Sequence, residues 1–125
     1  MKILAISGSL RETSSNSTLL KGFHALDLDS VEIFSGIGEL PFFSPDLEGR
    51  EGSAVLHFRA ALRQADALIL STPEYAFGMP GVLKNALDWL VSSGELYGKP
   101  VLAISASPTV EGGAKALANL LQVLT

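Results

Sequence analysis

The feature that most constrains the fold is an apolar run near the N-terminus that passes directly into a polar loop. Residues 3–7 read Ile-Leu-Ala-Ile-Ser, and the chain then breaks at Gly8 into hydroxyl, amide and guanidinium side chains. A short continuous apolar run is typical of a strand buried on both faces, as in a parallel sheet. The apolar spacing that follows the loop is helical. The sequence therefore predicts a strand that feeds a helix through a polar loop.

Such a loop is a candidate anion site. The first turn of a helix offers unpaired N–H groups and the positive end of the helix dipole, and both stabilise a phosphate. The side chains that add hydrogen-bond donors here are those of Ser9, Arg11, Ser14, Ser15, Asn16 and Ser17. Turns rich in Ser and Asn also serve as helix caps. The residues alone leave capping and phosphate binding equally open.

Motifs that the chain lacks narrow the kind of phosphate site. There is no G-x-x-x-x-G-K-[ST] segment, and the first turn has no G-x-G-x-x-G, so neither a P-loop nor a dinucleotide fingerprint is present. The G-x-S-x-G elbow of serine hydrolases is absent as well. A phospho-receiver domain needs acidic residues where this chain has Ser7 and Gly8. A cradle of Ser, Arg and Asn side chains is what a flavodoxin-like fold uses for the terminal phosphate of FMN.

The rest of the chain alternates strand and helix patterns. Further strands are expected at 31–34, 67–71 and 101–105, and helices at 19–26, 55–66, 82–90 and 117–125. The order βαβαβαβα predicts a parallel sheet with right-handed crossovers and helices on both faces. Ligands of such folds lie outside the carboxyl ends of the strands, where the loops after the first, third and fourth strands fall. The long segment 35–53 is rich in Gly, Pro and apolar residues, and we expect it to pack on its own domain or on a second subunit.

The composition of the chain excludes several classes of function. The chain has 125 residues, enough for one domain, and no Cys, so any redox chemistry must come from a bound cofactor. Its net charge of −4, from 9 basic and 13 acidic residues, argues against nucleic-acid binding and raises the importance of Arg11 for holding a phosphate. No apolar run approaches the ~20 residues that span a bilayer, and the N-terminus does not resemble a signal peptide. We therefore expect a cytoplasmic protein without membrane partners.

Two loops carry a family resemblance. The first is Gly8-Ser9-Leu10-Arg11 with Ser14 and Asn16, and the second runs from Pro73-Glu74-Tyr75 to Asp88-Trp89. They closely resemble the NADPH-dependent FMN reductase family of flavodoxin-like proteins, which includes quinone, azo-dye and chromate reductases. Ser107-Pro108 with Gly112-Gly113 is similar to a third loop of that family. The resemblance implies a single FMN-binding domain over residues 1–125, an α/β three-layer sandwich with at least four strands in the order 2-1-3-4 and without the family's fifth strand.

The resemblance also implies a site and a reaction. The implied FMN-binding residues are Ser9, Arg11, Ser14, Asn16, Ser17, Pro73, Glu74, Tyr75, Ala76, Phe77 and Ser107. NADPH or NADH would give a hydride to FMN, which passes it to a quinone, azo, metal-ion or free-flavin acceptor. No protein acid or base is implied, because the cofactor carries the chemistry. An FMN-binding electron carrier and a non-catalytic domain without flavin are the alternatives.

Two expectations concern assembly. In a 2-1-3-4 order the fourth strand is a sheet edge with free backbone groups. We expect either a homodimer or homotetramer that covers this edge, or weakened flavin binding. The single Trp, Trp89, is expected at a subunit contact rather than on the flavin.

Overall fold

Four parallel strands form one sheet in the computed structural model, which describes residues 1–11, 14–25, 30–107 and 111–125. The strands are β1 (Lys2–Ser7), β2 (Ser30–Phe34), β3 (Ala67–Ser71) and β4 (Val101–Ile104). Their order is β2-β1-β3-β4, and each neighbouring pair is parallel. This order confirms the predicted topology, and β2 and β4 are the two edges of this sheet.

Helices connect the strands. They are α1 (Ser15–Ala25), α2 (Ser53–Gln64), α3 (Gly81–Asp88) and α4 (Ala114–Leu124), with short 3-10 turns η1 (Ile37–Glu39) and η2 (Pro45–Leu47). The predicted helix through Leu90 ends earlier, because the N–H of Leu90 bonds to the carbonyl of Leu87 in a tighter turn. Leu26, the last residue expected in the first helix, lies outside the described residues.

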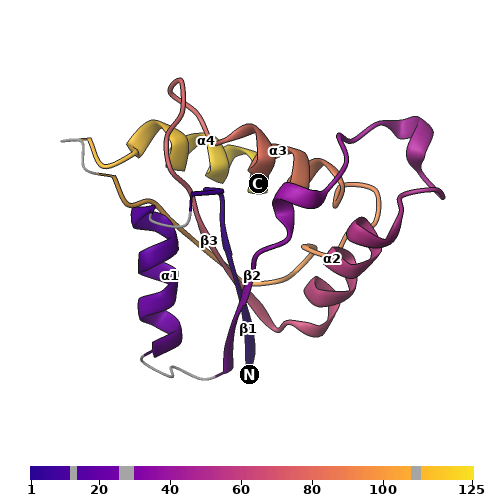
Figure 1. The fold of residues 1–125 in the computed structure, drawn as a ribbon, viewed down its shortest axis with the longest axis horizontal. Coiled ribbons are helices and arrows are strands. Elements are labelled where there is room, and N and C mark those ends of the chain that lie inside the picture. Colours follow the sequence, from indigo (N-terminus) through magenta and orange to yellow (C-terminus); the bar gives the residue numbers. More distant parts are fainter. Residues whose placement is uncertain (12–13, 26–29, 108–110) are drawn as a thin grey trace.

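Alternation along the strands divides the apolar side chains between two cores. Leu4 and Ile6 of β1 belong to a large cluster with residues of α2, α3 and α4. Ala5, between them, belongs to a smaller cluster with Ile69 of β3 and Leu20 of α1. Successive strand residues point to opposite faces, so the sheet has helices on both sides. Figure 1 shows α1 on one side of the sheet and α2 on the other, which confirms the three-layer sandwich.

The α1 face of the sheet carries an apolar groove of about 400 Å³. Its lining residues are Ile3, Phe23, Val31, Ala67, Leu68, Ile69, Pro100, Val101 and Leu102. The groove reaches the edge strand β4, where the side chain of Leu102 is 49% exposed. None of the helices in the described part of the chain is both long and apolar enough to cross a membrane.

The long segment between β2 and α2 folds back onto its own chain. The carbonyl of Pro41 accepts hydrogen bonds from Trp89 Nε1 at 2.8 Å and Asn85 Nδ2 at 3.0 Å, and Asn85 Oδ1 accepts the N–H of Phe43 at 2.8 Å. The ring of Phe43 meets that of Trp89 edge-on at 5.1 Å. Trp89 is fully buried by these contacts. The expectation that it lies at a subunit contact is therefore wrong, because its indole serves as an internal anchor for this segment.

A buried guanidinium fastens the same segment to α2. Arg59 donates two hydrogen bonds to the carbonyl of Trp89, at 2.7 and 3.2 Å, and one to Glu51 at 3.3 Å. Glu95, whose side chain is buried, lies 3.9 Å from Arg59 and 2.9 Å from Arg63. The N–H groups of Gly49 and of Glu51 itself, together with Arg59, lower the pKa of Glu51 below its ordinary value. This network fastens the end of the long segment to α2 and to the residue that follows α3.

Candidate cofactor-binding site

The loops that follow β1, β3 and β4 meet at the carboxyl edge of the sheet and enclose a cavity of about 420 Å³. Its lining residues are Ser9, Arg11, Ser14, Ser15, Asn16, Pro73, Glu74, Tyr75, Ala106 and Ser107. The structure thus brings most of the predicted cofactor residues together. Ser17, Ala76 and Phe77 are the predicted residues that do not line this cavity.

Hydroxyl groups shape the first loop. Ser14 Oγ accepts the N–H of Ser17 at 3.0 Å, which makes Ser14 the N-cap of α1. Ser9 Oγ accepts the N–H of Arg11 at 3.2 Å and so tightens the turn before the helix. Capping is therefore one role of this loop. It leaves the remaining first-turn N–H groups of α1 without partners inside the helix, so an anion can still bind them.

Ser17 turns away from the cavity. Its hydroxyl accepts a hydrogen bond from Ser14 Oγ at 2.9 Å and donates one to Ser7 Oγ at 3.2 Å. It lines a neighbouring hollow of about 360 Å³ between α1 and the end of β2, which it shares with Arg11. The exposed guanidinium of Arg11 therefore stands between the two hollows and can reach a ligand in either.

Asn16 joins all three loops. Its Nδ2 donates to the carbonyl of Ala106 at 2.9 Å, and its Oδ1 accepts from Ser71 Oγ at 2.6 Å and from the N–H of Ala106 at 3.0 Å. The side chain is 2% exposed. With its oxygen and one amide hydrogen used inside the protein, Asn16 is built to position the loops around a ligand. The sequence pattern gave no sign of this role, because its partners are 55 and 90 residues away.

Glu74 is also engaged within the protein. Glu74 Oε1 accepts the N–H of Ala116 at 2.9 Å, in the first turn of α4. The positive end of the helix dipole stabilises the carboxylate there. The contact ties the loop after β3 to α4, so Glu74 orders the loop rather than acting as a base.

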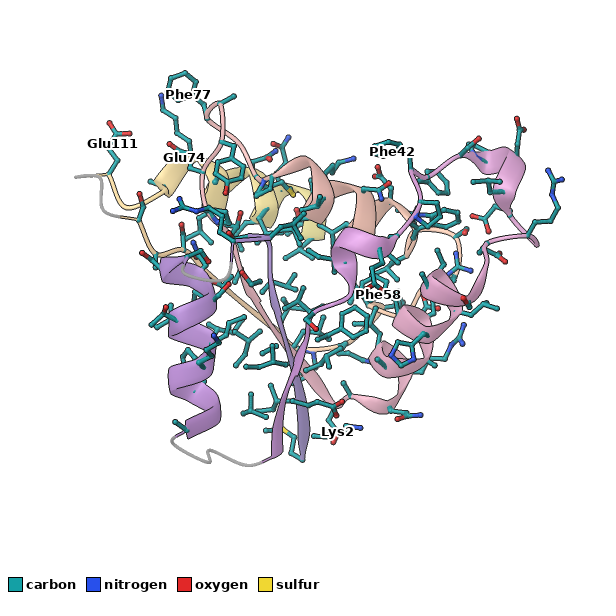
Figure 2. All side chains as sticks on the ribbon, in the orientation of Figure 1. Lys2, Phe42, Phe58, Glu74, Phe77 and Glu111 are labelled. Carbon is teal, nitrogen blue, oxygen red and sulfur yellow. The ribbon has the colours of Figure 1, made fainter. Side chains whose placement is uncertain are left out.

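A strained turn follows Glu74. Tyr75 and Gly78 exchange two backbone hydrogen bonds, at 2.9 and 3.0 Å, around Ala76 and Phe77. Both central residues have positive φ, 49° and 65°, the pattern of a type I′ turn. Side chains other than Gly and Asn pay for this conformation with roughly 1 to 2 kcal/mol per residue. Figure 2 shows Phe77 at the outer tip of the loop, beyond Glu74, and its side chain is 72% exposed.

The third loop depends on a glycine. Gly113 has φ 81°, and a Cβ there would lie 2.2 Å from Ser105 Oγ. That hydroxyl is already fixed, because it donates to the carbonyl of Thr72 at 2.7 Å. The pair Gly112-Gly113, noted in the sequence, thus allows the close approach of α4 to the end of β4. Pro108 lies outside the described residues, and Ser107 lines the cavity.

The chemistry of the lining fits FMN. Arg11 supplies the cation for a phosphate, the first turn of α1 supplies backbone N–H groups, and Ser15 adds an exposed hydroxyl. Tyr75, half exposed in the loop after β3, adds a flat ring to the lining. Among the described lining residues Glu74 is the one carboxylate, and it accepts the N–H of Ala116. An elongated ligand with a phosphate at one end and a planar ring at the other suits this arrangement.

The chain is similar to known reductases along its whole length. Residues 1–125 match the NADPH-dependent FMN reductase family. The quinone reductase of Escherichia coli is 35% identical, with 99% of this chain and 69% of that protein covered. An NAD(P)H-dependent FMN reductase of Pseudomonas aeruginosa is 40% identical, with 99% and 69% covered. The family resemblance of the two loops is therefore confirmed.

Solved structures of flavin-dependent reductases have the same fold as this chain. FerB, a flavoenzyme NAD(P)H:acceptor oxidoreductase from Paracoccus denitrificans, superposes with a TM-score of 0.89 at 35% identity, covering 98% of this chain and 70% of that one. An azoreductase from Bacillus anthracis, 19% identical, shares the fold with a TM-score of 0.67 over 99% of this chain and 80% of that one. The chain belongs to the NADPH-dependent FMN reductase family and is an FMN-dependent NAD(P)H oxidoreductase.

Proposed function

We propose that residues 1–125 act as one FMN-binding domain, with the phosphate of FMN held at the start of α1 and its ring placed toward Tyr75. The observation that carries the proposal is the convergence of Arg11, the first turn of α1 and the loop after β3 on one cavity. When bound, FMN supplies two-electron chemistry, accepting a hydride from NAD(P)H and giving it to an acceptor. The chain's own residues bind the phosphate, orient the ring and hold the loops.

A quinone is the acceptor class that we propose. Relatives named quinone reductase and NADPH:quinone oxidoreductase, from Escherichia coli and Arabidopsis thaliana, support this choice. Overall, NAD(P)H gives up two electrons and one proton as hydride, and the quinone takes two electrons and two protons to become a quinol. The second proton comes from solvent. A cytoplasmic location is part of the proposal, as the sequence led us to expect.

Arg11→Ala is expected to raise the dissociation constant of FMN about 10- to 100-fold, because a charge-assisted hydrogen bond to phosphate contributes roughly 1.5 to 3 kcal/mol. Flavin fluorescence quenching during titration of the purified chain measures this constant. Arg50→Ala is the matched control, since Arg50 lies exposed on the long segment and donates to the carbonyl of Asp46. Equal FMN affinities of the two variants would show that the phosphate does not bind at the first loop.

FMN titration together with a measurement of NAD(P)H oxidation distinguishes the reductase from an electron carrier and from a domain that binds no flavin. A chain that binds FMN but does not oxidise NAD(P)H in air is an electron carrier. A chain that does not quench the fluorescence of FMN does not bind the cofactor and is a non-catalytic domain. Turnover of NADPH with a quinone, together with saturable FMN binding, supports the reductase.

Association of two copies through β4 is the assembly that we propose. The apolar groove on the α1 face ends at this edge strand, and the half-exposed Leu102 stands on it. Edge strands and apolar patches both favour pairing with another chain. Leu102→Lys should break the contact through β4, so that a dimer becomes monomers or a tetramer becomes dimers in sedimentation velocity, with little change in the melting temperature. Leu56→Lys is the control, because Leu56 is similarly exposed, at 54%, on α2. Loss of assembly in both variants, or in neither, would contradict the β4 interface.

A further inference from the structure

The hollow of about 360 Å³ that adjoins the cofactor cavity has a lining of its own. We call it the β2-side hollow, and it is enclosed by Ser7 and Leu10, by Leu20 and Lys21 of α1, and by Ile33 and Phe34 of β2. Of the described lining residues, Ser9 and Arg11 are the two that it shares with the cavity. Small-molecule sites have volumes of ~300 to 1,000 Å³, so a compact ligand fits here. The hollow is therefore a candidate site for a second ligand, separate from FMN.

Part of the lining is apolar and open to solvent. Leu10 is 60% exposed and Ile33 is 37% exposed. Leu10 lies against η1, where a Cβ on Gly38 would come within 2.9 Å of Leu10 Cδ2. Leu20 and Ile37, which are buried, complete this apolar lining. Apolar side chains that stay exposed in a concave site favour a ligand with an apolar body.

The charged part of the lining is positive. Arg11 and Lys21 are both exposed, and neither side chain forms an ion pair within the described residues. No carboxylate is among the described residues that line the hollow. Glu32 of β2 pairs with Lys2 at 3.3 Å, at the opposite end of β1 from the hollow, and the exposed Glu39 of η1 lies outside the lining. The two cations are therefore available to an anion.

A relay of hydroxyl groups ends in the same hollow. Ser14 Oγ donates to Ser17 Oγ at 2.9 Å, and Ser17 Oγ donates to Ser7 Oγ at 3.2 Å. Ser7 Oγ also accepts the N–H of Ser9 at 3.1 Å. Within the described residues the hydrogen of Ser7 Oγ has no acceptor. This half-buried hydroxyl can thus donate to an anionic oxygen of a ligand.

We propose that the β2-side hollow binds aromatic carboxylates, with the ring against Leu10 and Ile33 and the carboxylate bound by Arg11 and Lys21. The cavity and the hollow share the guanidinium of Arg11, so such a ligand weakens the binding of FMN. By reciprocity, FMN weakens the binding of the ligand by the same factor. The hollow is a regulatory site that lowers flavin loading, and its occupancy is measurable on the flavin-free chain, independently of the proposed reductase function.

NMR titration of the ¹⁵N-labelled, flavin-free chain with 2-naphthoate and with its neutral analogue 2-naphthamide tests this site. The amide signals that shift should be those of Lys21, Ser35 and Ile37, which line the hollow. Naphthoate should bind about three- to tenfold more tightly than naphthamide at low salt, the range expected for two exposed ion pairs. High salt should reduce this preference, because it shortens the range of the charge interaction.

Two substitutions separate the charged from the apolar contribution. Lys21→Gln should weaken naphthoate binding about two- to fivefold and leave naphthamide binding unchanged, because it removes one exposed ion pair. Lys84→Gln is the matched control, since Lys84 is an exposed lysine that pairs with Asp88 on α3, outside the hollow. Ile33→Thr should weaken both probes alike, because it removes apolar surface while keeping a β-branched residue in the strand.

FMN titration with and without saturating naphthoate measures the coupling. The dissociation constant of FMN should rise about two- to fivefold, and that of naphthoate should rise by the same factor in the FMN-loaded protein. An unchanged FMN affinity, or equal binding of naphthoate and naphthamide, would overturn the proposal. Naphthoate shifts at Tyr75 and Ser107 of the cavity, or at Val101 and Leu102 of the apolar groove, would overturn it as well. A chain that binds naphthoate in the hollow but never binds FMN would contradict only the flavin function.

Discussion

Replacing Arg59 with Met is expected to lower the free energy of unfolding by about 3 to 5 kcal/mol, the cost of removing one partner from a buried ion pair. Met fills the volume of the side chain but leaves the buried carboxylate of Glu95 and the carbonyl of Trp89 without this donor. The carboxylate of Glu51 loses its contact with the guanidinium as well. Urea denaturation followed by circular dichroism measures the loss.

Arg63→Met is the matched control for this experiment. Arg63 also contacts Glu95, at 2.9 Å, but its own side chain is 61% exposed. The buried carboxylate of Glu95 keeps the Ser93 hydroxyl and Arg59 as partners in this variant, and the carbonyl of Trp89 keeps its donor, so the loss should be smaller than that of Arg59→Met. Equal small losses in the two variants would show that Arg59 does not stabilise the long segment.

The same network should make the stability depend on pH. The pKa of Glu51 is lowered in the folded state, chiefly by the N–H of Gly49. A lowered carboxyl pKa stabilises the fold above the unfolded value, and this contribution is lost as pH falls through the folded pKa. Wild-type stability should therefore fall on acidification, and part of that fall should be absent in Arg59→Met.

Asn16→Ala is expected to lower the free energy of unfolding by roughly 3 kcal/mol, because buried polar groups left without partners cost about 1 to 3 kcal/mol. The substitution leaves the N–H and carbonyl of Ala106 and the hydroxyl of Ser71 unpaired at the junction of three loops. It should also weaken FMN binding, because the loops that line the cavity lose their common anchor. Urea denaturation and flavin titration measure the two effects.

Asn119→Ala provides the comparison for Asn16. Asn119 Oδ1 accepts the N–H of Met79 at 3.2 Å, and Asn119 is not among the described residues that line the cavity. This variant should lose only about 1 kcal/mol and keep the wild-type affinity for FMN. An Asn16 variant of normal stability with weak FMN binding would instead show that Asn16 contacts the cofactor directly.

The residue pattern alone predicted a parallel sheet with helices on both faces, whereas the strand order 2-1-3-4 was implied by the family resemblance. The apolar run at 67–71 indicates a strand buried on both faces, and the alternation of strand and helix patterns leaves few possible connections between the strands. The loops that follow parallel strands lie at the same edge of the sheet. For this reason Ser9, Arg11 and Tyr75 were predicted to share a site. These inferences succeed because they depend on local spacing and on the handedness of the chain.

The tertiary structure decided what those side chains do. Asn16 was predicted to hold a phosphate, and the structure shows that its side chain also joins Ser71, at the end of β3, to Ala106, which follows β4. Trp89 was expected at a subunit contact, but the carbonyl of Pro41 accepts its N–H in the interior. Lys115 Nζ lies 4.5 Å from the centroid of the Phe77 ring, a contact between distant residues that a turn with two positive φ values allows. Sequence spacing determines which elements form, whereas hydrogen-bond partners distant in sequence are set only when those elements pack.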